Sequence, residues 1–283
     1  MSVSWFRGKD RCALASIGRI CAVYIAFFSS SLGHAADNRL VLTGSSTVAP
    51  LAAEIGKRFE EQNPSIRVDV QSGGSSRGVA DARSGLADLG MASRAPNADE
   101  TDLQFFTIAR DGVGIIVNTN NSVRSLTDEQ IVAIYTGKIT DWSKAGGAAG
   151  RITVVNKAEG RSTLELFLHY FKLKGGDVKA HVIIGENQQA IKTVAGNPGA
   201  IGYVSIGSAE YEADHGAHIR LMPMSGVAAS VENVRSESFP LARPLNLISK
   251  GGPGAVARRF IDFARSRGVH DIVESQFFVP VAP

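Results

Sequence analysis

The feature that most constrains this 283-residue chain is a short apolar strand, followed by a loop rich in glycine and hydroxyl residues, followed by a helix. This arrangement occurs three times, over residues 40–59, 66–83 and 151–171. Strands that alternate with helices predict an α/β fold with a mainly parallel sheet. In such a sheet the loops that follow the strands meet at one edge, where ligands bind.

The loop of the third copy carries the densest set of polar groups. Lys157 and Arg161 are cations, Ser162 and Thr163 supply hydroxyls, and Glu159 can orient the cations or accept a proton-bearing oxygen. A helix that starts here also offers unpaired backbone N–H groups and a partial positive charge. We interpret the loop as one half of an oxyanion clamp. The alternative is that a hydroxyl caps the helix and the charges are solvated.

The first 36 residues are predicted to be a cleaved secretory signal peptide. Basic residues precede an apolar run over residues 20–28, which is too short to span a bilayer, and small residues follow near Ala35 and Ala36. Both cysteines, Cys12 and Cys21, lie in this segment. We therefore expect an exported protein without disulfides, and the rest of the sequence has no second long apolar segment.

The net charge of the expected mature chain argues against some classes of partner. Removing residues 1–36 leaves 26 basic and 26 acidic residues, so the basicity of the whole chain belongs to the export signal. A binder of nucleic acid or of an anionic membrane would carry a basic surplus. A small anion could still bind through local donors.

Four loops and one later segment together resemble a known family. The loops span residues 43–50, 74–78, 90–94 and 157–163, and the segment spans residues 239–245. They resemble the periplasmic phosphate-binding proteins of the PstS type, in order and over nearly the whole mature chain. Four anion loops in register are far more specific than any one of them.

The resemblance implies a two-lobed periplasmic-binding-protein fold, in which each lobe is a mainly parallel sheet flanked by helices. It implies one lobe over residues 37–117 and 244–283, a second over 118–243, and two crossings between them. It also implies a periplasmic, monomeric, non-enzymatic carrier without metal or cofactor, which holds phosphate between its lobes and delivers it to an inner-membrane ABC permease. Carriers of sulfate, molybdate or tungstate, and an anion sensor that signals, are the alternatives.

Ten ligand contacts follow from the resemblance, position by position: Ser46, Thr47, Ser75, Ser93, Arg94, Lys157, Glu159, Arg161, Ser162 and Thr163. Three features depart from the family pattern. The central loop reads Gly160-Arg161-Ser162-Thr163, where the family usually has Gly-Ser-Gly-Thr after an acidic residue. Arg94 stands where well-known members have an Asp that accepts the proton of hydrogen phosphate, although many relatives carry Ser-Arg here. Lys157 replaces an Arg, so an ammonium stands in place of a planar guanidinium that can donate two parallel hydrogen bonds to an oxyanion. Arg161 is a candidate to supply that guanidinium fork.

Two rival readings remain open in the sequence. Residues 74–78 match G-x-S-x-G between a strand and a helix, which would make Ser76 the nucleophile of a serine hydrolase, but no histidine has a motif that ties it to Ser76. Glu212, His215 and His218 are spaced like metal ligands but lie in a stretch that is typical of a solvated loop. The arginines near residues 258–267 are expected to form the solvated face of the last helix.

Overall fold

The computed structural model describes residues 39–281, so the expected signal peptide lies outside the described residues. Among residues 39–281, no helix is both long and apolar enough to cross a membrane.

The strands are β1 (Arg39–Gly44), β2 (Arg67–Ser72), β3 (Leu89–Ala92), β4 (Leu103–Asn118), β5 (Thr153–Lys157), β6 (Val182–Ile184), β7 (Ala200–Ser205), β8 (Ile219–Leu221), β9 (Ala242–Lys250) and β10 (Val279–Pro280). The α-helices are α1 (Val48–Gln62), α2 (Ser75–Ser84), α3 (Asp128–Tyr135), α4 (Ser162–Tyr170), α5 (Asn187–Ala195), α6 (Ile206–Asp214), α7 (Val231–Arg235), α8 (Ala255–Ala264) and α9 (His270–Ser275). Three short 3₁₀ helices are Trp142–Ala145, Gly175–Asp177 and Arg267–Val269.

The strands form a mixed sheet in the order β2-β1-β3-β9-β4-β7-β5-β6, and β8 and β10 also pair with β4. The predicted parallel pairing is present at both ends of the sheet, among β1, β2 and β3 and among β5, β6 and β7. The middle is antiparallel, because β4 and β9 run in opposite directions and each also pairs antiparallel with its outer neighbour. The fold class is α/β, and the loops of the parallel strands still open at a shared edge.

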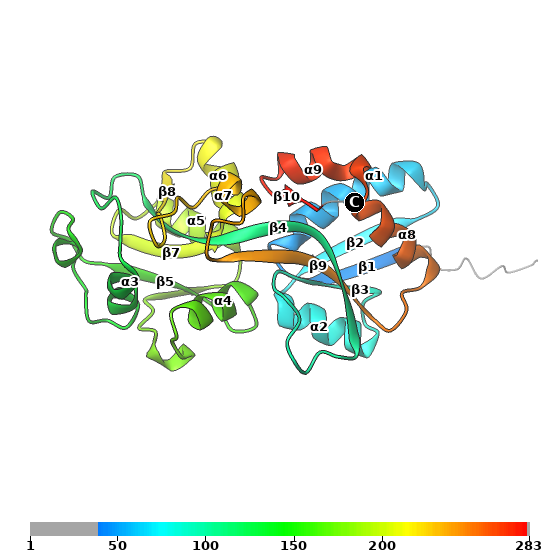
Figure 1. The fold of residues 1–283 in the computed structure, drawn as a ribbon, viewed down its shortest axis with the longest axis horizontal. Helices are drawn as coiled ribbons and strands as arrows, with labels where there is room; N and C mark the ends of the chain where they lie inside the picture. The colour runs from blue at the N-terminus through cyan, green and yellow to red at the C-terminus, as the bar shows by residue number, and fades with distance from the viewer. Residues whose placement is uncertain (1–38, 282–283) are drawn as a thin grey trace, which may run out of the picture. The chain divides into compact units, whose positions relative to one another are not determined.

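The long strand β4 joins two halves of the sheet. It pairs with β9 as far as Gly112, which lies opposite Ala242, and with β7 from Val113, which lies opposite Ser205. We call the strands β1, β2, β3, β9 and β10 with their helices the first half, and β5 to β8 with theirs the second half. Figure 1 shows β4 and β9 running between the two halves.

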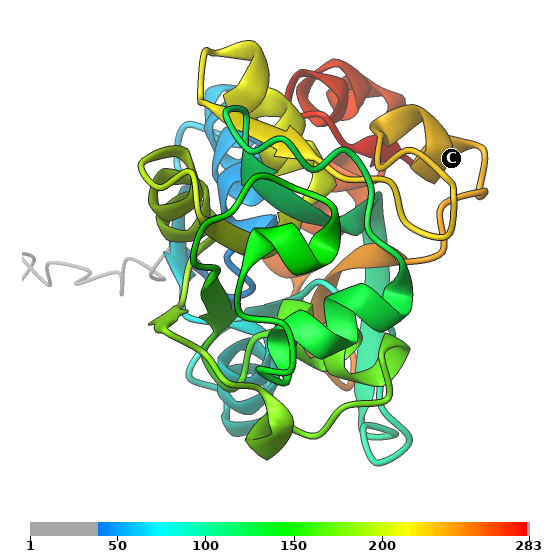
Figure 2. The same cartoon turned by 90° about the vertical axis from the view of Figure 1, so that its left-hand side faces the viewer.

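Helices pack on both faces of each half. In the first half, α1 and α8 share one apolar core, and α2 packs on the opposite face. In the second half, α3 and α4 pack on one face of the strands and α5 and α6 on the other, as the green and yellow helices of Figure 2 show. Phe167 and Tyr203 stack in this core with ring centroids 4.0 Å apart. Aromatic packing thus anchors α4, whose first turn belongs to the predicted anion loop.

Several helices form where the apolar spacing predicted them. Val48, Leu51 and Ile55 bury one face of α1, and Thr127 and Gln130 make the predicted capping box at α3. Residues 208–238, which show little periodicity, form α6, β8 and α7. β8 and α7 have three and five residues, which is too short for a pattern to emerge from the sequence.

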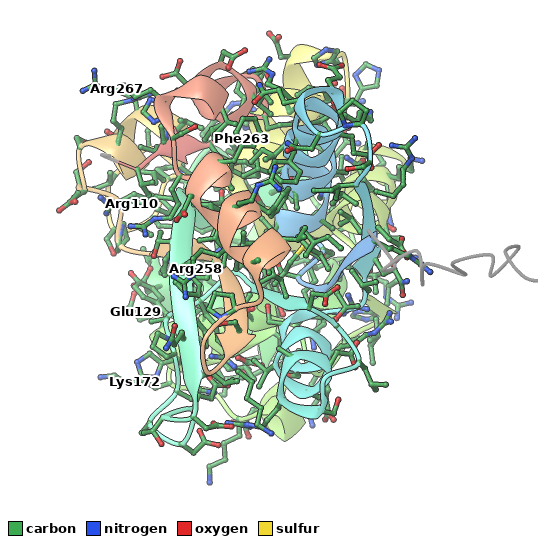
Figure 3. The ribbon with its side chains drawn as sticks, turned by 90° about the vertical axis from the view of Figure 1, so that its right-hand side faces the viewer. Arg110, Glu129, Lys172, Arg258, Phe263 and Arg267 are labelled. Atoms are coloured by element: carbon green, nitrogen blue, oxygen red, sulfur yellow. The ribbon has the colours of Figure 1, made fainter. Side chains whose placement is uncertain are left out.

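The last predicted helix is α8, and α9 follows it without having been predicted. Phe260 is buried, whereas Arg258 and Arg259 are exposed, as expected for a solvated face. Figure 3 shows α8 beside β4, with Arg258 and Arg267 at the surface. Arg259 lies over the ring of Phe59 and hydrogen-bonds Asn63. These two contacts explain the position of its side chain.

Gly78 allows α2 to lie directly against β1 and β3. A Cβ at this position would lie 2.6 Å from the Met91 carbonyl oxygen and 2.8 Å from the Thr43 carbonyl oxygen. Both obstacles are backbone atoms, which cannot rotate away. Because Ser75 sits one turn earlier on α2, this close approach also sets the position of that hydroxyl.

We expect Gly78→Ala to lower the free energy of unfolding by about 1–3 kcal/mol, because the added methyl forces α2 away from the sheet. Gly150→Ala is the matched control, since a Cβ there meets nothing within 4 Å. Urea denaturation of both variants tests this. Equal stabilities would show that α2 does not depend on the close approach.

Candidate functional site

Six buried hydroxyls gather where strands of both halves end and helices begin. We call them the hydroxyl cluster: Ser45, Thr47, Ser75, Ser93, Ser162 and Thr163. They follow β1 and β3 or open helices α2 and α4. The predicted convergence of distant hydroxyl loops is therefore present in the structure.

Direct hydrogen bonds join the hydroxyls of the two halves. The Ser93 hydroxyl oxygen lies 3.0 Å from that of Ser45 and 3.3 Å from that of Ser162. Ser75 and Ser162 also share a hydrogen bond between their hydroxyls, and the Ser93 amide donates to the Ser75 oxygen at 3.2 Å. Hydroxyls both donate and accept, so in this structure they satisfy one another.

A buried ion pair, Arg243 with Asp111, lies against the hydroxyl cluster. The two residues face each other across β9 and β4. Arg243 Nη2 and Nε lie 2.8 and 3.1 Å from Asp111 Oδ2, and both side chains are 1% exposed. The remaining N–H groups of Arg243 donate to Thr163 at 2.9 Å, Thr47 at 3.2 Å and Ser93 at 3.3 Å. One guanidinium thus reaches hydroxyls from both halves.

Helices α2 and α4 begin at the cluster without a side-chain cap. The residue before α2 is Gly74 and the residue before α4 is Arg161, and neither makes a capping side-chain hydrogen bond. Ser162 and Thr163 lie inside the first turn of α4, so the alternative in which one of them caps this helix is wrong. The backbone N–H groups of a first turn are available to an anion when no cap occupies them.

Lys157 approaches from the end of β5 and is 2% exposed. Its Nζ donates to Asn187 Oδ1 at 3.0 Å, and Asn187 Nδ2 donates to Thr47 Oγ1 at 3.0 Å. The pKa of Lys157 is lowered to about 7, mainly by burial and also by the nearby positive charge of Arg243. The ammonium therefore adjoins the hydroxyl cluster through Asn187.

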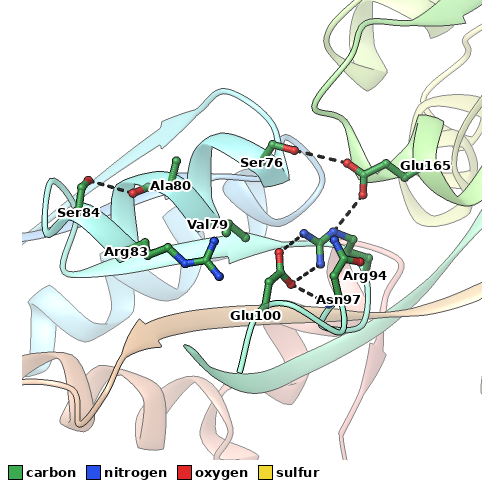
Figure 4. A pocket seen from close by; sticks show the side chains of 9 residues that line it. All are labelled: Ser76, Val79, Ala80, Arg83, Ser84, Arg94, Asn97, Glu100 and Glu165. Atoms are coloured by element: carbon green, nitrogen blue, oxygen red, sulfur yellow. Dashed lines mark hydrogen bonds and ion pairs between the residues drawn. The ribbon is translucent and has the colours of Figure 1, made fainter. Parts of the chain in front are cut away.

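Arg94 does not point into the cluster. Its Nη2 and Nη1 lie 2.6 and 2.8 Å from the carboxylate oxygens of Glu100, and its Nε lies 3.0 Å from Glu165 Oε2. This pairing lowers the pKa of Glu100 through the hydrogen bond from Arg94. Figure 4 shows these contacts. They lie in a pocket of about 500 Å³ that is lined by α2, Asn97 and Glu165 among others. Two carboxylates thus hold Arg94 between α2 and α4. We call this region, outside the hydroxyl cluster, the rim.

Three other predicted contacts also stay outside the hydroxyl cluster. The Arg161 guanidinium pairs with Glu186 at 2.9 Å, and the Glu159 side chain is exposed. Ser46 is half-buried and makes no side-chain hydrogen bond within residues 39–281. Local carboxylates and loop geometry decide these positions, which the resemblance alone could not show.

Four residues of the site were missed by the sequence analysis: Ser45, Asp111, Asn187 and Arg243. Asp111 and Arg243 carried a weak signal, because each is a charge inside a mainly apolar strand, although Arg110 and Lys250 stand in the same two strands. A buried charge needs a partner, so two such charges of opposite sign suggest a pair. The resemblance indicated Ser46 in place of its neighbour Ser45. Nothing in the sequence marks Asn187 as a site residue beyond its position at the start of a helix.

The structure also bears on the two rival readings. The Ser76 hydroxyl lies 3.4 Å from Glu165 Oε1, and no histidine hydrogen-bonds it within residues 39–281. A serine nucleophile needs an adjacent base that can take its proton. Glu212 and His215 lie on or beside α6, and no group of three metal-binding side chains was found in the described part of the chain.

Comparison with known proteins places the chain in a family. Residues 30–267 match the PBP superfamily domain. A protein from Clostridium perfringens, described as a phosphate ABC transporter substrate-binding protein and solved with bound phosphate, is 31% identical, with a TM-score of 0.80 over 86% of this chain and all of that one. The chain is a PstS-type member of this superfamily. The phosphate-binding protein PstS of Bacillus subtilis is 28% identical over 87% of this PstS-type chain and 82% of its own length. An ABC-type phosphate transport receptor from Vibrio cholerae is 27% identical, with a TM-score of 0.71 over 86% of this chain and all of that one.

We expect Arg243→Met to lower the free energy of unfolding by about 3–5 kcal/mol, because it leaves the Asp111 carboxylate buried without its cation. The double variant Asp111→Asn, Arg243→Met removes both charges and should regain a large part of that loss. Urea denaturation measures both. If the double variant were as unstable as the single one, the pair would not be the source of the loss.

Proposed function

We propose that this protein captures inorganic phosphate at the hydroxyl cluster and delivers it to an inner-membrane ABC permease. One observation carries the proposal: six buried hydroxyls, two uncapped helix starts and two cations converge from both halves of the sheet. The family and the relatives named above support phosphate as the anion. The predicted signal peptide supports a periplasmic location.

The chemistry of the cluster favours a multiply charged oxyanion over other small ligands. Hydroxyls, backbone N–H groups, the Arg243 guanidinium and the Lys157 ammonium are all donors, and the neighbouring carboxylate of Asp111 is already occupied by Arg243. Hydrogen bonds to a charged group contribute about 1.5–3 kcal/mol each. A micromolar dissociation constant needs about 8 kcal/mol in total, so a few of these donors suffice once desolvation is offset.

We propose a contact set that differs from the one implied by the resemblance. Thr47, Ser75, Ser93, Lys157, Ser162 and Thr163 are retained, and Ser45, Arg243 and Asn187 are added. Ser46 is left out, because its side chain makes no hydrogen bond within residues 39–281. Arg94, Glu159 and Arg161 are placed at the rim. Among residues 39–281 the two arginines pair with carboxylates and, unlike Arg243, make no side-chain hydrogen bond to the hydroxyl cluster, and Glu159 is exposed. Arg243 then supplies the planar fork that Lys157 lacks.

We further propose that the two halves act as lobes, over residues 37–117 with 244–283 and over 118–243, which close around the anion in a monomeric carrier. Contacts between the halves support this. The Ser76 amide donates to the Gly160 carbonyl at 3.2 Å, and Arg94 and Ser76 both contact Glu165. The permease would then recognise the closed state, which binding selects.

We expect Ser162→Ala to weaken phosphate binding by about tenfold or more, since it removes one hydrogen bond to a charged ligand. Ser275→Ala, an exposed hydroxyl on α9, is the control, and Arg94→Ala should change the affinity by no more than about threefold. Calorimetry of the mature protein with phosphate, arsenate, sulfate, molybdate and tungstate measures all three.

Three calorimetric outcomes would change the proposal in different ways. Preference for sulfate or tungstate would keep oxyanion capture and replace the substrate. Absence of binding by any of these anions to folded protein would remove the function. Wild-type affinity in Ser162→Ala would move the site away from the hydroxyl cluster.

We expect Glu165→Gln to release phosphate about twofold to fivefold faster than the wild type. The variant loses the charge that pairs with the buried Arg94 across the rim. The Glu165 side chain is 38% exposed, and ion pairs that solvent can reach contribute about 0.2–1 kcal/mol. Stopped-flow measurement of dissociation tests this. Glu232→Gln, which loses a pair within one helix, is the control. An unchanged rate in Glu165→Gln would show that the rim pair does not hold the closed state.

A further inference from the structure

Lys157 is the one cation of the site without a carboxylate partner among the described residues. Its Nζ is buried and its side-chain hydrogen bond goes to the neutral amide of Asn187. Asn187 in turn donates to Thr47 and to Ser208, so the amide is held in place with its oxygen toward Lys157. The ammonium is fixed in position, and its charge is not balanced by the protein.

The other charges around Lys157 cancel in pairs. Arg243 is neutralised by Asp111 at 2.8 Å, and Arg161 is neutralised by Glu186 at 2.9 Å. Arg243, Glu186 and Arg161, the charged groups that shift the pKa of Lys157, all belong to these two pairs. A protonated Lys157 therefore leaves the site with one uncompensated positive charge.

Burying an unpaired ammonium is costly, and the cost disfavours the protonated form. Burial is the largest cause of the lowered pKa of Lys157, at about 7, and Arg243 and Arg161 lower it while Glu186 raises it. Tyr203, whose hydroxyl accepts a hydrogen bond from the Lys157 amide, has a pKa raised by burial and stays neutral. An anion beside Nζ would supply the missing negative charge and restore the protonated form.

We propose that Lys157 makes anion capture proton-linked: the bound oxyanion is the counter-ion of the Lys157 ammonium, and a dianion enters the site together with one proton. This rests on the proposed function and specifies the charge state that the site accepts. The step involves no covalent bond. One proton moves from solvent to Nζ as the dianion binds.

The sign of the pH dependence follows from the two protonation states. Below about pH 7, Lys157 is charged before the anion arrives, and this residue adds no pH dependence. Above about pH 7, the free site must first gain a proton, so affinity falls by up to about tenfold per pH unit until the raised pKa of the complex is reached. A permanently charged residue in the same place would remove this fall.

The test is calorimetric titration of the mature protein with inorganic phosphate at about pH 8.5, where phosphate is a dianion and most free Lys157 is neutral. Titrations in two buffers of different ionisation enthalpy give the number of protons taken up. We expect close to one proton per phosphate for the wild type. Uptake of no proton by a protein that binds phosphate would overturn the proposal and leave the proposed function intact, whereas absence of phosphate binding would end both.

Two substitutions assign the proton to Lys157. Lys157→Arg stays charged and should bind phosphate without proton uptake and without the fall in affinity above about pH 7. Lys157→Gln is neutral, keeps a hydrogen-bonding side chain beside Asn187, and should bind more weakly, also without proton uptake. Lys192→Arg, an exposed position on α5, is the control and should behave as the wild type. Proton uptake that persists in both Lys157 variants would overturn the assignment.

NMR of labelled lysine side chains tests the proposal even where a folded variant does not bind phosphate. In wild-type protein with ¹³C-labelled lysine, one side-chain resonance should titrate near pH 7 without phosphate and at a higher pH with it. That resonance should be absent from Lys157→Gln. If every lysine resonance titrated near its ordinary pKa in the free protein, the proposal would fail.

Discussion

The site depends on the ion pair between Arg243 and Asp111 at the place where β4 changes partners. These residues lie opposite each other in the β4–β9 register, and β4 begins to pair with β7 two residues after Asp111. A buried charge is tolerated only with a partner, so the two strands must keep this register. The same guanidinium reaches hydroxyls of both halves, which ties the geometry of the strands to that of the site.

Around that pair the protein gathers hydrogen-bond donors that an anion can use. The hydroxyls satisfy each other in the described structure, and two helix starts have no side-chain caps. Lys157 has an amide partner where a carboxylate would balance its charge. A site built in this way is completed by an anion, because the ligand supplies both the acceptors and the negative charge. The rim residues Arg94 and Glu165 contribute by holding the halves together.

The hydroxyls of the site were largely predictable, and its charges were not. Ser75, Ser93, Ser162 and Thr163 stand at strand ends in a repeated pattern, and parallel strands bring such positions to one edge. Arg94 and Arg161 stand in the same loops, yet each pairs with a carboxylate from elsewhere in the chain. A long side chain can reach several partners. Its position in the sequence therefore predicts where its backbone lies but not which group its charged end contacts.

The sequence by itself determined the α/β class, the helices that follow the anion loops and the family resemblance, because apolar periodicity and loop composition are local properties. The tertiary structure decided the antiparallel middle of the sheet, the pairing of Asp111 with Arg243, and the approach of Asn187 to Lys157. These contacts join residues far apart in the chain. Such pairs form only when strands and helices from both halves are packed in register, and no local pattern records them.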